Sequence, residues 1–447
     1  MFRIAIQTLG CKTNHYESAS LAERFSEAGF TLVPADQEAE LYLLNSCTVT
    51  HEAGRKCEQQ LRRYRRNFPA AKIAVMGCHS QLKDLSELAD FTRGVMGRLD
   101  IVNWAIELRA ELRGTEPETL AEAKLATSSL GRSSRASEYE SLGILSTAHG
   151  TRAEVKIQDG CEMFCAYCAI CLARGKVRSR SRAEILAEVK SLTENGVQEI
   201  VLTGIHLCSF EKDLGRDSLA LAELVEELAA VPKLQRIRLG SLEPKSMSDE
   251  VLTRLAAVDK LCPHFHLSLQ SGCSSTLKRM RRQYTAEEYA SRVSKIRELF
   301  TRPAITTDVM VAFPEESAAE HRESMDFILE NLLSRLHIFR YSPRAHTSAA
   351  KLPQLAPEIA KERSREAQDL AEFLLHKFLV RNFAAELEVL LEEIDQASWV
   401  GYSENYIRCR LSPEFTEVFQ KGQIIKVRPK EILGEELIVV PSEAAEN

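Results

Sequence analysis

Short apolar runs alternate with amphipathic stretches of helical period from Arg152 onward, and this rhythm restricts the folds open to the chain. The expected strands are Ala153–Gln158, Glu199–Thr203, Leu234–Leu239, His264–Gln270, Ile305–Ala312 and Leu336–Tyr341. Their starts lie roughly 30–45 residues apart, the spacing of parallel strands joined by crossover helices. Six such units fall short of the eight in a complete βα barrel. The sequence therefore predicts a partial (βα)6 barrel, closed by a long helix over Pro357–Arg381.

Two smaller units are expected on either side of this barrel. Upstream, strands alternate with helices, which predicts a small three-layer α/β domain. Its strands are Phe2–Gln7, Leu41–Asn45 and Lys72–Met76, with helical stretches near Ser18–Ala28 and Glu52–Asn67. Downstream, short alternating strands predict a small all-β barrel. They cover Glu386–Leu391, Tyr406–Leu411, Gln423–Pro429 and Glu436–Val440.

The expected fold class is therefore α/β, with three unequal domains. We place the N-terminal domain at residues 1–112, the partial barrel at 147–377 and the all-β unit at 380–445. Residues 113–146 are rich in Ser, Thr, Ala and Arg and lack apolar periodicity, so we expect a linker there. A chain of 447 residues is long enough for three cores of this kind.

Charge and cysteine content narrow the class of protein. Because 58 Lys and Arg face 64 Asp and Glu, the net charge of −6 provides no global positive field, and a nucleic acid must be held by a local patch. The absence of a secretory signal and of a run of about 18 apolar residues favours a soluble, cytoplasmic protein without a membrane span. In a reducing cytoplasm, clustered cysteines among the 12 point to metal, cluster or catalytic roles rather than disulfides.

Three cysteines in a C-x3-C-x2-C pattern, Cys161, Cys165 and Cys168, follow the first barrel strand directly. We call them the barrel cysteines. Thiolates this close together can wrap one metal centre, and loops at the C-terminal ends of barrel strands carry active sites. On a [4Fe-4S] cluster, three thiolates leave one iron open to a bidentate amino-acid moiety such as that of S-adenosylmethionine. Cys171 keeps a closed four-cysteine cluster or a zinc site open as alternatives, and inert thiols are a further one.

The cysteine loop also carries a family resemblance. Cys161-x3-Cys165-x-Tyr167-Cys168, followed by ARGKVRSR over residues 173–180, resembles the radical S-adenosylmethionine superfamily and, within it, the methylthiotransferases. Three cysteines at ends of upstream strands match that family's N-terminal cluster ligands. They are Cys11, Cys47 and Cys78, here called the N-terminal cysteines. The resemblance implies that they hold a second [4Fe-4S] cluster, whereas the remaining cysteines other than Cys171 are expected to be buried structural thiols.

Later strand ends resemble the superfamily's cofactor-binding surfaces. The residues expected to line S-adenosylmethionine are Tyr167, Thr203, Gly204, Ser241, Glu243 and Gln270. The chain departs from the family at Ala312 and Glu315, where glycine is usual, and at Cys171, where proline is usual. Each strand-end motif is weak alone, and an ordinary turn is the alternative for any one of them.

Two regions indicate contact with RNA. A cation at every second residue between Arg174 and Arg180 would lie on one side of an extended segment and neutralise phosphates. The C-terminal unit resembles the TRAM domain, an RNA-binding module whose loop residues can stack on unpaired bases. The residues expected to contact RNA are Arg174, Lys176, Arg178, Arg180, Tyr402, Asn405 and Tyr406. Basic runs at 62–66 and 278–282 add to this signal, although solvated faces and a plain hairpin remain the alternatives.

The resemblance implies a tRNA methylthiotransferase with two [4Fe-4S] clusters and S-adenosylmethionine. The barrel cysteines would be catalytic, because their cluster would generate a 5′-deoxyadenosyl radical, and the N-terminal cluster would supply the methylated sulfur. Lys12 and Thr13 resemble the branch that acts on N6-threonylcarbamoyladenosine at tRNA position 37 and yields its 2-methylthio derivative, with substitution at adenine carbon 2. Implied partners are the anticodon loop, a sulfur donor and a reductant such as flavodoxin or ferredoxin.

Three alternatives remain open at this point. The isopentenyladenosine branch and the ribosomal-protein branch of the same family tend to show Gly-Cys-Gln-Met-Asn and Gly-Cys-Pro-Lys-Asn where this chain has Gly-Cys-Lys-Thr-Asn over residues 10–14, so few residues distinguish the branches. From another class, a non-catalytic iron–sulfur electron carrier with an RNA-binding tail would result if Cys171 closed the loop cluster.

Overall fold

The N-terminal unit is a five-stranded parallel sheet in a computed structural model that describes residues 1–48, 51–115, 138–143 and 151–444. Its strands are β1 (Arg3–Thr8), β2 (Thr31–Val33), β3 (Leu41–Ser46), β4 (Lys72–Gly77) and β5 (Phe91–Thr92), in the order β2-β1-β3-β4-β5. Its helices are α1 (Lys12–Glu27), α2 (His51–Asn67), α3 (Cys78–Leu82) and α4 (Leu99–Arg113). Strand β3 is buried throughout because helices cover both faces of the sheet. Leu41 and Leu43 belong to one core, and Tyr42 and Leu44 to the other.

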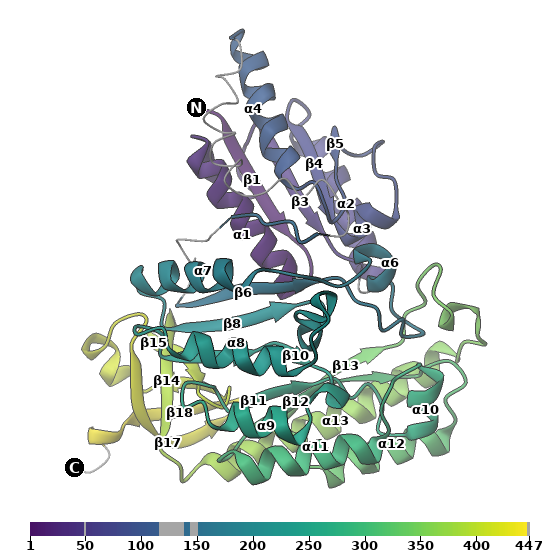
Figure 1. The fold of residues 1–447 in the computed structure, drawn as a ribbon, viewed down its shortest axis with the longest axis vertical. Coiled ribbons are helices and arrows are strands. Elements are labelled where there is room, and N and C mark those ends of the chain that lie inside the picture. Colours follow the sequence, from purple (N-terminus) through teal and green to yellow (C-terminus); the bar gives the residue numbers. More distant parts are fainter. Residues whose placement is uncertain (49–50, 116–137, 144–150, 445–447) are drawn as a thin grey trace.

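The central unit contains the six predicted parallel strands in the predicted order, so the partial barrel is confirmed (Figure 1). These are β6 (Arg152–Asp159), β8 (Glu199–Gly204), β9 (Arg236–Leu239), β11 (His264–Leu267), β12 (Ala304–Val311) and β13 (Arg335–Arg340). Two short strands that the sequence did not predict, β7 (Arg178–Ser179) and β10 (Ser241–Leu242), extend the sheets β7-β6-β8-β9 and β10-β11-β12-β13. A parallel bridge between Ile237 and Leu261 links the two sheets.

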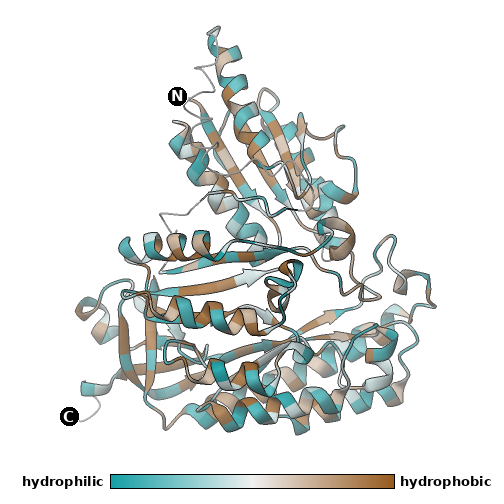
Figure 2. Cartoon of the chain, in the orientation of Figure 1, coloured by the Kyte–Doolittle hydropathy of each residue, from teal (hydrophilic) through white to brown (hydrophobic). Residues whose placement is uncertain are grey.

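Helices cover the outside of the barrel. The longer ones are α7 (Arg182–Glu194), α8 (Leu219–Ala229), α9 (Asp249–Ala256), α11 (Ala286–Leu299), α12 (Ala318–Glu330) and α13 (Pro357–Asn382), and the short ones are α6 (Ile170–Arg174) and α10 (Ser274–Arg279). Four of them begin at a serine or threonine whose side chain accepts a backbone N–H of the first turn, namely Ser181, Ser248, Thr285 and Ser317. Their apolar faces point inward against the strands (Figure 2).

The C-terminal unit is a closed five-stranded barrel, as the sequence predicted in class. Its strands are β14 (Leu387–Asp395), β15 (Ser398–Ser403), β16 (Arg408–Leu411), β17 (Ile424–Leu433) and β18 (Glu436–Pro441). The sequence did not predict β15, which contains Gly401. A Cβ at Gly401 would lie 1.8 Å from the carbonyl oxygen of Leu390 on β14, so the close approach of β14 requires glycine there. Glycine in a strand interior weakens the sequence pattern of a strand, which is why β15 was not predicted.

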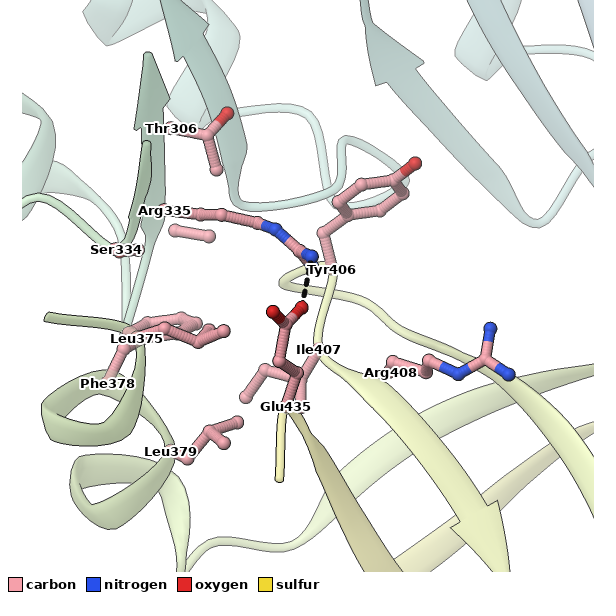
Figure 3. Close-up of a pocket in the computed structure, with 11 residues that line it drawn as sticks. Thr306, Ser334, Arg335, Leu375, Phe378, Leu379, Tyr406, Ile407, Arg408 and Glu435 are labelled. Atoms are coloured by element: carbon pink, nitrogen blue, oxygen red, sulfur yellow. Dashed lines mark hydrogen bonds and ion pairs between the residues drawn. The ribbon is translucent and has the colours of Figure 1, made fainter. Parts of the chain in front are cut away.

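The C-terminal barrel packs against the N-terminal ends of the central strands. Arg152, Arg236 and Arg335, at the starts of β6, β9 and β13, reach Glu392 at 2.6 Å, the carbonyl oxygen of Glu388 at 2.7 Å and Glu435 at 2.6 Å respectively. Figure 3 shows Arg335 and Glu435 at the rim of a small cavity, about 10 Å³ in volume, between α13 and the two barrels. This end of the central barrel is therefore filled by the C-terminal unit.

Most of the predicted linker at 113–146 lies outside the described residues. None of the helices in the described part of the chain combines the length and apolar character that a membrane span requires.

Candidate active site

The barrel cysteines lie on the loop that follows β6, at the C-terminal ends of the central strands. All three are half-buried, and their thiols interact electrostatically with one another. Burial raises the pKa of Cys161 to about 11 and that of Cys168 to about 12. Cys165 accepts a hydrogen bond from Arg282, at 3.2 Å from Nη1 to Sγ. A guanidinium beside a sulfur favours the thiolate form that an iron ligand requires.

The N-terminal cysteines lie at the C-terminal ends of β1, β3 and β4, which are neighbours in the sheet. Adjacent parallel strands bring these ends to one edge although the residues are far apart in sequence. A Cβ at Gly10, whose φ is +129°, would lie 3.2 Å from the Cys47 sulfur, so glycine lets the loop that bears Cys11 approach Cys47. Cys11 and Cys78 also interact electrostatically.

The two sets of cysteines face the same junction between the N-terminal sheet and the barrel. Cys78 packs with Ile170 and Ala173 of α6, the helix that begins two residues after Cys168. Among the described residues, no three His, Cys, Asp or Glu side chains are already arranged around a single metal ion. Each set of three thiols has an arginine nitrogen 3.2 Å from one of its sulfurs, Arg174 at Cys78 and Arg282 at Cys165, and cysteine thiolates are the ligands that hold iron–sulfur clusters.

A buried arginine supplies the cation on the N-terminal side. Arg174 Nε lies 3.2 Å from Cys78 Sγ, and its other nitrogens bind Glu17 at 2.7 Å and Asp159 at 3.0 Å. Burial alone would raise the pKa of both carboxyls, but the adjacent cations outweigh it and lower the pKa of Glu17 to about 2. These carboxylates are therefore ionised and hold the junction together.

The expected cofactor-binding residues lie at the C-terminal ends of the central strands, next to the cysteine loop. Thr203 and Gly204 end β8, and Ser241 is exposed on β10. Gln270 is buried with φ at +68°, and its backbone bonds to β12 fix this conformation. Glu243 is buried and binds Arg282 at 2.6 Å. Arg282 thus links Glu243 to Cys165, and it also interacts electrostatically with Tyr167. The strand ends and the cysteine loop therefore form one site.

Sequence reasoning missed the role of Arg282. It lies in the basic run 278–282, which we interpreted as a contact for RNA, yet its side chain is buried against Glu243 and Cys165. Arg279 of the same run binds Glu320 at 2.7 Å. The run begins six residues after the strand-end motif at residues 267–272, which was expected to line the cofactor. That position is the signal that could have revealed the role of Arg282 in the site.

The predicted basic stripe is wrong as an exposed surface. Arg174, Arg178 and Arg180 are buried, and only Lys176 of the four is exposed. Arg180 binds Glu188 at 2.8 Å and the hydroxyl of Tyr16 at 3.0 Å. The reason is that this segment crosses the interface with the N-terminal unit, where Glu17 and Tyr16 of α1 contact Arg174 and Arg180.

The predicted RNA contacts of the C-terminal unit also face inward. Asn405 is buried and bonds to Asn382, and the ring of Tyr406 stacks between His264 at 4.4 Å and Tyr402 at 4.7 Å. Arg152 lies over the ring of Tyr402. These contacts join the C-terminal barrel to the central barrel at the end opposite the cysteines. Asn405 is thus not exposed to RNA, whereas base stacking by the half-buried Tyr402 and Tyr406 stays a prediction.

Polar side chains line the interior of the central barrel below the strand ends. His266 contacts Thr306 at 3.0 Å and Asp308 at 3.4 Å, and its ring lies 5.6 Å from that of His337. Lys12, the exposed residue after Cys11, interacts electrostatically with Glu154 on β6 and with His337 on β13. Because β6 and β13 are the first and last of the six parallel strands, Lys12 faces the lateral opening of the partial barrel.

Comparisons with known families agree with this geometry. A family model described as the radical SAM superfamily matches residues 155–328, and one described as uncharacterized protein family UPF0004 matches residues 3–97. Among solved structures, the radical S-adenosylmethionine methyltransferase TsrM from Kitasatospora setae, with cobalamin and a [4Fe-4S] cluster bound, has a TM-score of 0.53. It covers 78% of this chain and 74% of its own at 13% identity, which shows a shared fold.

Curated relatives cover nearly the whole chain. The threonylcarbamoyladenosine tRNA methylthiotransferase MtaB of Bacillus subtilis is 34% identical over 96% of this chain and 94% of its own. The protein of the same name from Aquifex aeolicus is 35% identical over 91% and 95%. The tRNA-2-methylthio-N(6)-dimethylallyladenosine synthase of Acetivibrio thermocellus is 30% identical over 88% and 81%. With this identity over the full set of units, the protein belongs to the radical SAM methylthiotransferase family, in the branch of the MtaB proteins.

Proposed function

We propose that the protein is a tRNA methylthiotransferase that converts N6-threonylcarbamoyladenosine at position 37 into its 2-methylthio derivative. The observation that carries the proposal is the meeting of two three-cysteine sets at one junction, in a chain whose MtaB relatives are named for this activity. The barrel cysteines would hold the [4Fe-4S] cluster that binds S-adenosylmethionine, and the N-terminal cysteines the second cluster. When bound, these groups supply radical generation and a source of sulfur.

The side chains around the barrel cysteines have defined tasks in this proposal. Glu243 and Gln270 would bind polar groups of S-adenosylmethionine, while the backbone at Gly204 lets the cofactor approach β8. Arg282 holds Glu243 and Cys165 in register through contacts of 2.6 and 3.2 Å. Tyr167 would close one side and exclude water from the reacting centre.

Lys12 supports the choice of the threonylcarbamoyl substrate. The threonyl group carries a carboxylate, whereas the dimethylallyl group is apolar, and an exposed ammonium at the barrel opening suits the former. We expect Lys12→Met to lower kcat/KM on tRNA with the threonylcarbamoyl group by roughly tenfold or more, since hydrogen bonds to charged groups contribute about 1.5–3 kcal/mol. Lys233→Met, a change of the same kind at an exposed lysine on another surface, serves as the control. Equal kcat/KM for both variants would contradict this assignment.

The tRNA anticodon loop is the proposed macromolecular partner, and a reductant such as flavodoxin or ferredoxin and a sulfur donor are proposed in addition. Since most of the stripe at 174–180 is buried, the basic run near the C-terminal end of α2 becomes a candidate surface for RNA on the N-terminal unit. Its exposed arginines are Arg62, Arg63, Arg65 and Arg66. Lys176 stays a candidate on the cysteine loop.

The test is anaerobic reconstitution with iron, sulfide, reductant and S-adenosylmethionine, followed by mass spectrometry of tRNA nucleosides. The wild-type chain should release 5′-deoxyadenosine and form the 2-methylthio nucleoside. Alanine at the barrel cysteines should abolish both products, whereas alanine at the N-terminal cysteines should abolish the methylthio product and leave 5′-deoxyadenosine. Absence of 5′-deoxyadenosine from reconstituted wild type would refute the enzyme. Methylthiolation of a dimethylallyl substrate instead would assign the other branch.

A further inference from the structure

We propose that Arg174 is a positioning residue of the N-terminal cluster, whose guanidinium donates a hydrogen bond to the ligand sulfur of Cys78 and thereby sets the reduction potential of that cluster. The inference rests on the proposed function, because it requires a cluster on the N-terminal cysteines. It adds a residue from the barrel to the surroundings of a cluster held by another domain.

Arg174 is placed for this role by contacts on every nitrogen. Nε lies 3.2 Å from Cys78 Sγ, Nη1 lies 2.7 Å from Glu17, and Nη2 lies 2.9 Å from Asn14 Oδ1. Asn14 is itself fixed, because its amide donates to the carbonyl oxygens of Leu9 and Ser46. The guanidinium is therefore held rigidly with one N–H directed at the sulfur, and the side chain is 1% exposed.

The charges at the junction give a reason for the sulfur contact. The connected ion pairs among the described residues contain four cations and three carboxylates. The cations are Arg98, Lys156, Arg174 and Arg178, and the carboxylates are Glu17, Glu140 and Asp159. An uncompensated buried charge is costly. Among the described residues these pairs therefore contain one more cation than carboxylate, which suits a neighbouring sulfur that binds iron as a thiolate.

The position of Arg174 in the sequence links the two cysteine sets. It ends α6, six residues after Cys168, so the loop that carries the barrel cysteines also carries the arginine that reaches Cys78. Cys78 in turn starts α3, and α3 packs against α6. Any displacement of the barrel loop relative to the N-terminal sheet would therefore lengthen the Arg174–Cys78 contact.

A purely structural arginine would hold the two units together without affecting the cluster. Arg180 provides a control for that role. It is also buried at the junction and binds Glu188 at 2.8 Å and Tyr16 of α1 at 3.0 Å, and its contacts include no sulfur among those of the described residues. Lysine at either position keeps the charge but loses the planar fork that reaches several partners at once.

The experiment measures the N-terminal cluster by itself in the full-length chain. The barrel cysteines are replaced by alanine, and the remaining cluster is titrated redox-potentiometrically with electron paramagnetic resonance as the readout. Hydrogen bonds to cluster sulfurs and nearby positive charge stabilise the reduced state, so their loss lowers the potential. We expect Arg174→Lys to shift the midpoint potential to more negative values and Arg174→Gln to shift it further, while Arg180→Lys leaves it unchanged.

A second measurement needs no change at Arg174. It uses the same parent chain without the barrel cysteines, because Arg282 also lies 3.2 Å from a cysteine sulfur, that of Cys165, and would give its own coupling to a barrel cluster. In protein labelled with 15N at the arginine guanidinium groups, pulsed electron paramagnetic resonance of the reduced cluster should detect a weakly coupled 15N nucleus. Equal potentials in Arg174→Lys, Arg174→Gln and Arg180→Lys, or the absence of the 15N coupling, would overturn the inference while leaving the proposed function intact. Failure of the N-terminal cysteines to bind any [4Fe-4S] cluster in the parent chain would overturn both.

Discussion

Replacing Glu17 by glutamine removes the carboxylate at the centre of the junction between the N-terminal unit and the barrel. Glu17 lies on α1 and is fully buried. Its oxygens bind Arg98 at 2.8 Å, Lys156 at 2.7 Å and Arg174 at 2.7 Å. Glutamine preserves the size of the side chain, but its neutral amide leaves these cations without their shared counter-ion. The variant therefore tests whether the buried charges stabilise the docking of the two units.

The pKa of Glu17 gives the size of the effect. Burial raises this pKa, but the surrounding cations outweigh burial and lower it from 4.5 to about 2. At 1.36 kcal/mol per unit, the shift corresponds to about 3 kcal/mol of stabilisation at neutral pH. Removal of one partner from a buried ion pair typically costs about 3–5 kcal/mol, which agrees. We expect Tm to fall by roughly 6–12 °C, because each kcal/mol shifts Tm by about 2–4 °C in a unit of this size.

The assay is thermal unfolding followed by circular dichroism between pH 7 and pH 3. Because the folded pKa of Glu17 lies below the unfolded value, its stabilisation is complete above pH 4.5 and is lost as the pH falls toward 2. The difference in Tm between wild type and Glu17→Gln should therefore shrink on acidification. Glu298→Gln removes an exposed pair with Lys295 and should cost less than 1 kcal/mol. A Glu17→Gln variant as stable as Glu298→Gln, or a difference in Tm independent of pH, would refute the reasoning.

Three further predictions concern other positions. Ala312 has φ at +58°, so Ala312→Gly should raise the free energy of unfolding by up to about 1 kcal/mol, the reverse of the usual effect; denaturant titration checks this. Cys171 is half-buried, with its sulfur 3.5 Å from the carbonyl oxygen of Cys168, so Cys171→Ala should leave the iron content and the yield of 5′-deoxyadenosine unchanged; loss of iron would make it a ligand. Arg63→Glu with Arg66→Glu should weaken tRNA binding and reduce the slope of log K against log salt by about 2, whereas an unchanged slope would exclude α2 from the RNA surface.

The sequence predicted those parts of the fold that depend on local periodicity. The six central strands and the helices between them each span enough residues to show their period, and α13 was predicted to within one residue at its C-terminal end. Strands β7 and β10 have two residues each, which is too short for any period to appear. Strand β15 was not predicted because Gly401 interrupts its apolar alternation. Glycine is needed there because β14, the neighbouring strand in the barrel, approaches closely.

The candidate site likewise has a part that could be predicted and a part that could not. The N-terminal cysteines were placed together by the family resemblance, because their wide spacing in the sequence carries little weight by itself. The strand pattern only allowed it, since parallel strands can bring their C-terminal ends to one edge of a sheet. The burial of Arg174 and Arg180 could not be predicted, since their partners on α1, Glu17 and Tyr16 respectively, lie more than 150 residues earlier in the chain. Alternation of charge shows only that side chains point to one side of a segment. Whether that side faces water or another domain is decided by tertiary packing.

The burial of these arginines also changes what the net charge of −6 means for RNA recognition. Five cations, Arg98, Lys156, Arg174, Arg178 and Arg180, are enclosed at the junction and contribute little to the field outside the protein. The carboxylates enclosed with them cancel most of their charge in any case. A polyanion therefore meets a molecule of acidic net charge, without the positive field that these five cations would add if they were exposed. Contact with phosphates is then left to exposed cations such as those of α2, which favours a specific substrate over unspecific RNA.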